Sequence, residues 1–437
     1  MKKSYFIHAI WLVVAIGAYA IGHFSTIKQT VSADGTQSES TRLLLSASEN
    51  NAGSNTSRRT TSSEVPVSQI ADLFNIKSGP LKDHEIEAAA KEAFSDPNPL
   101  KRQLAFARLL ESLTPENAEA IRDQMREGRA GGDQWRLFQY AWGAIDPTGA
   151  MAAAEAIEDE GRRNGAVGMA LSGWASADPA SAIDWLSKME PGDNKTRMES
   201  ELINGLADNN INTATNYVLE LMNAGNTRAS QYMETVASEQ LRKGGHLSAA
   251  LWAEQLPDGA VKGAAMDRVA SVYVSRDPQA AAAWAQQFAT ADYASRVIEE
   301  VGDEWAERDP VASVNWLESL ADGKGKSEGM YSALGEWVRR DPEAASQYLV
   351  DMPASEMKDS AVSGFVRRLA WDDPQSAVAW ADTISQENVR VETLKRAGQA
   401  WVTRDRNAAV EWLKTSGLPE ATQKEIMNPP RDRRRRG

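Results

Sequence analysis

Apolar and polar residues alternate along most of this chain with a helical spacing that restarts every 32 residues. A small polar residue, usually Asp, marks each restart and is numbered position 0. Small or apolar side chains then recur at +4, +7, +8 and +11, which is one face of an α-helix. A second stripe falls at −11, −8 and −4 before the next restart. The pattern predicts two helices per repeat, joined by a turn.

Position 0 has the chemistry of a helix start. All ten residues there are of types favoured at a helix N-cap, and Pro follows seven of them. Eight of the nine intervals between them are 32 residues, and the one from Asn210 to Gly245 is 35, so the spacing is not accidental. The ten are Thr114, Asp146, Asp178, Asn210, Gly245, Asp277, Asp309, Asp341, Asp373 and Asp405.

Aromatic residues concentrate at two positions of the repeat. Position +7 is aromatic in eight of the ten repeats, and with position −4 it holds eleven of the fourteen tryptophans. Both positions lie on the apolar stripes, so we expect these rings to pack between helices. The alternative is a platform of exposed rings that stacks on carbohydrate.

A hairpin of this size cannot bury its apolar face alone, so stacked copies would share a continuous core. The sequence therefore predicts an all-α fold, a right- or left-handed superhelical solenoid of about ten two-helix repeats. Residues 82–94 keep the stripe as Ile86, Ala89, Ala90 and Ala93 but lack Asp-Pro, which is typical of a capping unit.

The boundary between repeats resembles that of the tetratricopeptide-repeat class of helical solenoids. The resemblance rests on Asp-Pro followed by Trp six residues after Pro, as in Pro278 to Trp284 and Pro310 to Trp316, and covers about residues 80–415. The period here is 32 rather than 34, and Gln287-Phe288 and Ser319-Leu320 stand where that class has Leu-Gly. The resemblance implies peptide or protein binding along a concave face.

The ends of the chain differ from the repeats. Residues 1–24 carry two lysines before an apolar run, which predicts a transmembrane signal-anchor or, with Ala18-Tyr19-Ala20 as a cleavage site, a signal peptide. Residues 25–66 are rich in Ser and Thr, typical of a disordered tether. The repeat domain is expected at 67–427 and a basic disordered tail at 428–437. The body is thus expected outside the cytoplasm, membrane-anchored, or secreted if the chain is cleaved after Ala20.

Composition narrows the chemistry. The chain has no Cys and four His, which argues against thiolate or histidine metal sites, and no cofactor is predicted. The net charge is −13, and because both ends are basic or neutral, residues 67–430 carry about −19. That charge argues against nucleic acid as the main partner. No known catalytic motif is present, so no enzymatic activity is expected.

Two sets of residues are candidate binding groups. The first is polar and lies at +6, beside the apolar stripe, where it would meet a peptide partner if the first helices line the concave surface; ordinary solvated surface is the alternative. The second is the terminal arginine run, which would contact anionic lipid or polymer, fold back on the acidic body, or aid solubility. The first set is Asp184, Asn216, Asn315, Gln347 and Glu411, and the second is Arg431, Arg433, Arg434, Arg435 and Arg436.

We therefore expect a non-enzymatic extracytoplasmic scaffold that binds a protein or peptide and is attached to the membrane through its N-terminal segment. The alternative is a binder of envelope polymer (glycan or anionic lipid), or an accessory to a cell-wall lytic enzyme, acting through exposed aromatic rings and the arginine run.

Overall fold

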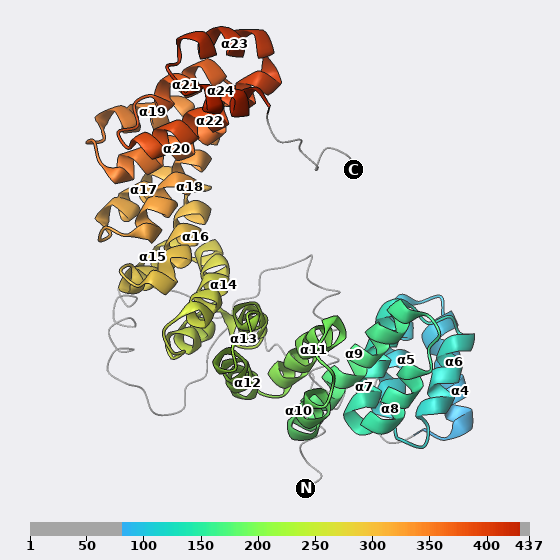
Figure 1. Cartoon of the computed structure of the whole chain (residues 1–437). Helices are drawn as coiled ribbons and strands as arrows, with labels where there is room; N and C mark the ends of the chain where they lie inside the picture. The colour runs from blue at the N-terminus through green and yellow to red at the C-terminus, as the bar shows by residue number, and fades with distance from the viewer. Residues whose placement is uncertain (1–80, 429–437) are drawn as a thin grey trace, which may run out of the picture. The chain divides into compact units, whose positions relative to one another are not determined.

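The computed structural model describes residues 81–428 (Figure 1). This part of the chain is all-α, and its helices pack in neighbouring pairs. The predicted segments 1–24 and 25–66, and the arginine run 431–436, lie outside the described residues. Among the residues described, no helix is long and apolar enough to cross a membrane.

The chain divides into two compact units, residues 1–149 and 150–437. The described helices of the first are α4 (Asp83–Ser95), α5 (Pro99–Glu111), α6 (Ala118–Glu127) and α7 (Gly132–Ile145), and α8 (Pro147–Glu155) runs across the division. The second unit continues with α9 (Glu160–Ala177), α10 (Pro179–Ser187), α11 (Asp193–Asn209), α12 (Ile211–Asn223), α13 (Ala229–Glu254), α14 (Ala260–Arg276), α15 (Pro278–Ala285), α16 (Ser295–Ala306), α17 (Pro310–Ser319), α18 (Lys324–Arg340), α19 (Pro342–Asp351), α20 (Glu356–Leu369), α21 (Pro374–Ala381), α22 (Glu387–Arg404), α23 (Arg406–Thr415) and α24 (Glu420–Met427).

Helices begin where position 0 predicts. The side chain of Asp or Asn at eight of the ten positions accepts a hydrogen bond from a backbone N–H of the first helical turn, at 2.8–3.2 Å. Each bond satisfies one of the N–H groups that a helix start leaves without an intrahelical partner. The prediction of a cap and a helix start at these residues is confirmed.

Gly245 fills the same position by a different means. It has no side chain to cap a helix, and α13 runs through it as one element broken only at this residue, where φ is 71° and ψ is 176°. A residue with a Cβ is strained at such a positive φ, so glycine suits the bend. The predicted boundary between two helices is present here as a kink.

The aromatic rings at −4 and +7, called the aromatic ladder below, are buried or half-buried. In five places the ring at −4 of one repeat packs against the ring at +7 of the next, with centroids 5.3–6.2 Å apart. This boundary between successive repeats is called the seam below. Trp284, Trp305, Trp316, Trp337 and Trp401 are buried, which confirms that these positions serve packing. Trp371, outside the ladder, is the one exposed tryptophan among the described residues.

The second unit has two layers. We call the helix that follows position 0 the first helix of its repeat and the one after the turn the second helix. Consecutive second helices pack against one another along this unit. They are α9, α11, the part of α13 before Gly245, α14, α16, α18, α20 and α22. Each described first helix from α10 to α21 packs on second helices, and successive first helices make no comparable contact.

Candidate functional site

Glycine lets the second helices approach closely. A Cβ added to Gly364 of α20 would lie 1.8 Å from the backbone oxygen of Tyr331 in α18, and one added to Gly205 of α11 would lie 2.1 Å from that of Ser172 in α9. Only a residue without a side chain fits such backbone-to-backbone contact. The second-helix layer is therefore a closely packed surface, and its shape is set by main chain as well as by side chains.

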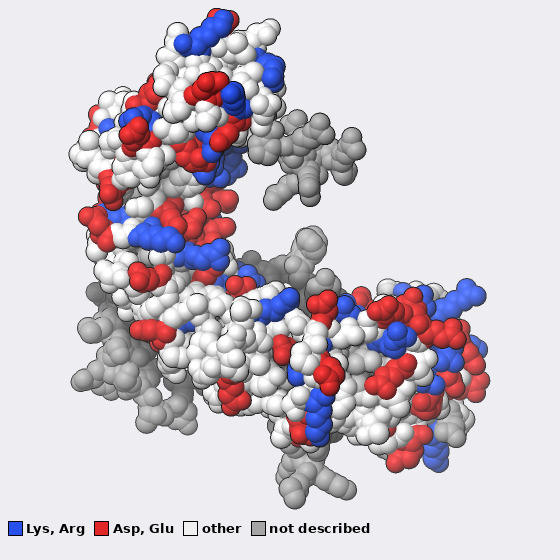
Figure 2. All heavy atoms as spheres, in the orientation of Figure 1, with Lys and Arg blue, Asp and Glu red and all other residues white. Residues whose placement is uncertain are grey.

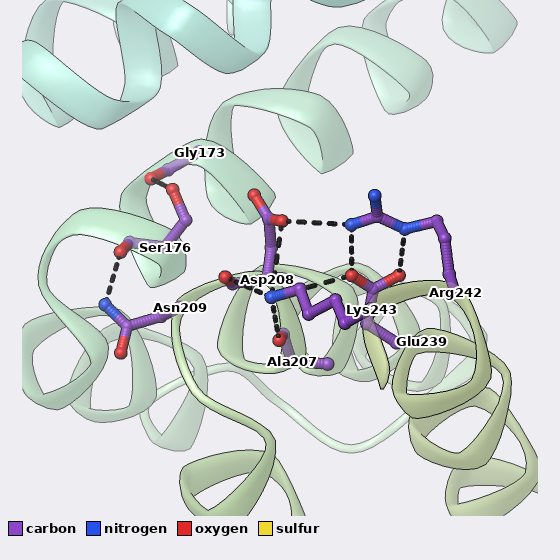
Figure 3. A network of polar contacts seen from close by, with 8 residues as sticks. All are labelled: Gly173, Ser176, Ala207, Asp208, Asn209, Glu239, Arg242 and Lys243. Atoms are coloured by element: carbon purple, nitrogen blue, oxygen red, sulfur yellow. Dashed lines mark hydrogen bonds and ion pairs between the residues drawn. The ribbon is translucent and has the colours of Figure 1, made fainter. Parts of the chain in front are cut away.

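Hydrogen bonds also fasten the C-terminal ends of neighbouring second helices (Figure 3). The Asn209 side-chain amide donates to the Ser176 carbonyl at 2.6 Å, and Lys243 Nζ donates to the Ala207 and Asp208 carbonyls at 2.9 and 2.6 Å. Arg242 pairs with Asp208 at 3.5 Å and also with Glu239. The last carbonyls of a helix have no intrahelical donor, so a side chain from the next repeat satisfies them.

In three repeats the Arg that precedes position 0 makes the same kind of hydrogen bond, from its side chain to a backbone carbonyl of the preceding repeat. Arg308 donates to the Ser275 carbonyl at 2.9 Å, Arg340 to the Arg308 carbonyl at 2.8 Å, and Arg404 to the Trp371 carbonyl at 2.5 Å. Each of these cations therefore joins the end of its own repeat to the repeat before it.

A second set of cations caps the first helices, and sequence reasoning missed it. At position −15 a Lys or Arg donates to the carbonyl at +11 of the preceding first helix, at 2.7–3.1 Å. The signal was a basic residue recurring at that position, at the start of the second helix. The five are Arg163, Lys195, Lys326, Lys358 and Arg390.

The outward face of the second-helix layer carries an acidic cluster. The cluster comes from three neighbouring helices, and Figure 2 shows red side chains gathered over α16 and α18. Each member is half-buried. The cluster, called the acidic face below, consists of Asp267 of α14, Glu299, Glu300, Asp303 and Glu304 of α16, and Glu336 of α18.

Crowding and burial disfavour ionisation of these carboxyls. Burial, with Asp267, Glu304, Asp303 and Glu299 adding to it, raises the pKa of Glu300 to about 7. Burial, then the neighbouring Glu336 and Glu304, raises the pKa of Asp303 to about 6, although Arg367 opposes the shift. Like charges held together in this way favour the approach of a cation.

Cations border the face but do not neutralise it. Arg296 lies near Asp267, Arg339 pairs with Glu336 at 2.7 Å, and Arg367 lies over the Tyr331 ring at 5.0 Å. Arg268 donates to Ser238 at 2.9 Å. Arg308 also acts on Glu304, and Glu234 of α13 acts on Asp267. The acids outnumber the arginines, so the surface keeps a net negative charge.

The residues predicted to bind a partner lie on the other layer. They are exposed, one to a helix, on α10, α12, α17, α19 and α23: Asp184, Asn216, Asn315, Gln347 and Glu411. No hydrogen bond or ion pair of the described residues joins one of them to another. Three have local partners instead: Asp184 pairs with Lys188 at 2.6 Å, Gln347 donates to Asp351 at 3.1 Å, and Glu411 pairs with Lys414 at 2.5 Å. Their role in binding stays a prediction.

Comparison with known proteins assigns no class. No protein family, curated protein or solved structure matches this chain. In residues 81–428, no group of three or more His, Asp or Glu is arranged to hold a metal ion.

Proposed function

We propose that the helical hairpins form an α-solenoid, similar in class to tetratricopeptide repeats, that acts as a non-enzymatic scaffold for a protein or peptide partner. In this proposal residues 1–24 attach the chain to the membrane or direct its export, 25–66 tether it, and the body works outside the cytoplasm. The repeats support the scaffold role because every helix from α4 to α24 belongs to a repeat or to a capping hairpin.

One observation carries the binding role. Within the second helices, position −4 is a large apolar residue in every repeat of the second unit. Position −6, which is exposed or half-buried in six of the eight repeats, changes its chemistry from repeat to repeat. A constant interior with a variable surface is how stacked repeats build a specific binding surface. The exposed or half-buried residues at −6 are Asn204, Glu239, Ser271, Asp303, Arg367 and Gln399, and the two buried ones are Ser172 and Gly335.

The second-helix layer supports binding better than the +6 row does. Its helices touch one another, so their outward positions make one surface with a step of about 8–10 Å per repeat. An extended peptide rises about 3.3 Å per residue, so roughly three residues of a partner would match each repeat. The +6 residues sit on first helices that do not adjoin in this way.

The alternative function is binding of an envelope polymer. Trp371, 55% exposed, favours it, because an exposed indole can stack on a sugar ring. The aromatic ladder does not contribute to such a platform, since its rings face one another inside the seams. Quenching of tryptophan fluorescence distinguishes the two functions. Buried ladder tryptophans should resist an aqueous quencher. Only a glycan binder should have tryptophan fluorescence that is quenched and that added glycan then protects.

A pull-down from envelope extract tests the proposal. The full chain is compared with a variant in which Arg431 and Arg433 to Arg436 are replaced by Gln, across a range of salt concentrations. A protein retained specifically by both chains, and lost when the outward residues of the second helices are changed, supports the scaffold. Capture of polymer or lipid alone, only by the arginine-bearing chain at low salt, contradicts it and favours the alternative.

A further inference from the structure

One boundary between repeats lacks the features that stiffen the others. At Gly245 no side chain caps the following helix, His246 stands where most repeats have Pro, and the −4 residue is Leu241 rather than an aromatic ring. The boundary at Asp309 has all three features: a side-chain cap at 3.0 Å from a backbone N–H, Pro310 at the helix start, and a ring pair at its seam. Among the eight boundaries of the second unit, all within the described residues, only the one at Gly245 has none of them.

Two consecutive glycines, Gly244 and Gly245, give this boundary a wide choice of backbone angles. They are called the glycine pair below. Gly245 has φ 71° and ψ 176°, a combination that essentially only glycine adopts. Both glycines are exposed, and a Cβ added to Gly245 would meet nothing within 4 Å, so side-chain packing does not confine this residue to one conformation. At the other boundaries a cap, and in most of them a Pro with fixed φ, restricts the same step of the chain.

The helices before the glycine pair are fastened to each other (Figure 3). Lys243 donates to the Ala207 and Asp208 carbonyls at 2.9 and 2.6 Å, which joins the last turn of α13 before the glycines to the end of α11. Near the other end of the same two helices, the Tyr232 hydroxyl donates to the Glu199 carboxylate at 2.9 Å. Helix α11 and this part of α13 are therefore held together at both ends.

The helices after the glycine pair are fastened as well. The ring of His246 packs on that of Tyr273 in α14, with centroids 4.9 Å apart. Trp284 of α15 donates from Nε1 to the carboxylate of Glu254, the last residue of α13, at 2.9 Å. The part of α13 that follows Gly245 is thus joined at its start to α14 and at its end to α15.

The contacts across the glycine pair are of a weaker kind. Gln240 donates to the Ser248 hydroxyl at 3.2 Å, and Arg268 of α14 donates to the Ser238 hydroxyl at 2.9 Å; both hydrogen bonds are exposed. Water replaces an exposed hydrogen bond at little cost in free energy. Helix α13 also packs on α14, and apolar packing is not directional, so it tolerates a small rotation. Rotation is therefore easiest at the two glycines.

We propose that the glycine pair is a hinge within the second unit. On one side of it lie helices α9 to α12 and α13 up to Lys243, and on the other lie α13 from His246 and helices α14 to α24. Rotation at the hinge changes the angle between the second-helix surfaces of these two segments, and a ligand that contacts both segments fixes that angle. The hinge is a property of the free chain and does not depend on the proposed function.

Distance measurements between pairs of spin labels test the hinge in the full chain. The chain has no cysteine, so two introduced cysteines carry the labels. One pair, Asn204 of α11 with Asp303 of α16, spans the glycine pair, and the matched pair, Ser271 of α14 with Arg367 of α20, does not. All four residues occupy position −6, and the members of each pair are three repeats apart, so the matched pair controls for the flexibility of ordinary boundaries.

The hinge predicts a broader distance distribution for 204–303 than for 271–367. Gly245→Asp with His246→Pro restores the Asp-Pro of the other boundaries and is expected to narrow the first distribution to about the width of the second, because Asp caps the helix and Pro fixes φ. The mean of the first distance should shift too, since Asp309 in the same position has φ −140°. The 271–367 distribution should not change.

The reverse exchange is the control. Asp309→Gly with Pro310→Gly places two glycines at a boundary that only the 271–367 pair spans, and is expected to broaden that distribution and leave 204–303 unchanged. Equal widths for the two pairs in the chain with its own Gly245 overturn the proposal, and so does a 204–303 distribution that stays broad in the Asp-Pro variant. If the Asp-Pro variant fails to fold, both of its distributions broaden, and the comparison of the two pairs in the chain with its own Gly245 decides.

Discussion

The two helix layers of the second unit come from the same repeat but are stabilised differently. Second helices touch one another through glycines and are fastened at their ends by side-chain bonds to carbonyls of the preceding repeat. First helices are shorter, are held at their starts by Asp caps and are attached to second helices by aromatic pairs. The comparison suggests that the second layer fixes the geometry of the stack, while the first layer fills its seams.

The largest effect is expected at an aromatic seam. Trp316→Ala removes a buried indole that faces Trp305, with ring centroids 6.1 Å apart, and should lower the free energy of unfolding by about 3–5 kcal/mol. Asn315→Ala, the neighbouring exposed residue, should leave it nearly unchanged. Urea denaturation of both variants checks this, and equal losses would mean that the faces of α17 are assigned wrongly.

A somewhat smaller effect is expected where second helices touch. Gly364→Ala places a methyl group against the Tyr331 carbonyl and should cost about 1–3 kcal/mol, because backbone must move apart. The control is Gly165→Ala in α9, where an added Cβ meets nothing within 4 Å and should stabilise the helix by up to about 1 kcal/mol. If both variants unfold alike, close contact does not hold the second layer together.

Removal of a side chain that caps a first helix from the neighbouring second helix should lower the free energy of unfolding by an intermediate amount. Lys326, 8% exposed, donates to the Leu320 and Glu318 carbonyls at 2.8 and 3.1 Å, so Lys326→Met should cost about 1–2 kcal/mol by leaving them unsatisfied. Lys324→Met, in the same helix, loses only an exposed ion pair of 3.5 Å with Glu328 and should change stability by a few tenths of a kcal/mol. Thermal unfolding distinguishes the two, and a larger loss in the Lys324 variant would contradict the capping role.

The smallest effect is expected on the acidic face and depends on pH. The pKa of Glu300 rises from 4.5 to about 7, so the folded state holds more protons and stability falls as pH rises between these values. Glu300→Gln should therefore leave the melting temperature unchanged near the lower value and raise it above the upper one. The gain should be about 1 kcal/mol or less, since the side chain is partly solvated. A gain that is the same at every pH would show that the repulsion is absent.

Much of the fold was predictable from the sequence because its signals are local. Asp309 and Pro310 set a helix start through groups three residues away, and Trp316 marks the buried stripe of the same helix. Which of the two helix layers forms the continuous stack was not predictable. It depends on contacts between neighbouring repeats, such as Gly364 with Tyr331 and Arg340 with Arg308. Helical periodicity shows which residues are buried but not which neighbour covers them.

The candidate site was hidden for the same reason. Asp267, Asp303 and Glu336 are more than thirty residues apart in the chain, and each alone is an ordinary polar residue on an amphipathic helix. Only the packing of α14, α16 and α18 makes them neighbours. The +6 residues were easier to find, because polarity beside an apolar stripe is visible within one repeat.

Site-specific photo-crosslinking in cells that produce the full chain tests the central claim most directly. A crosslinking amino acid is placed at Asn204, Ser271 and Arg367 on second helices, and at Asn216, Asn315 and Gln347 on first helices. The account predicts that a partner protein is captured from the second-helix positions and not from the first-helix positions. Capture from Asn216, Asn315 and Gln347 instead would show that the partner binds the first-helix layer, and would contradict the assignment of the second-helix layer as the binding surface.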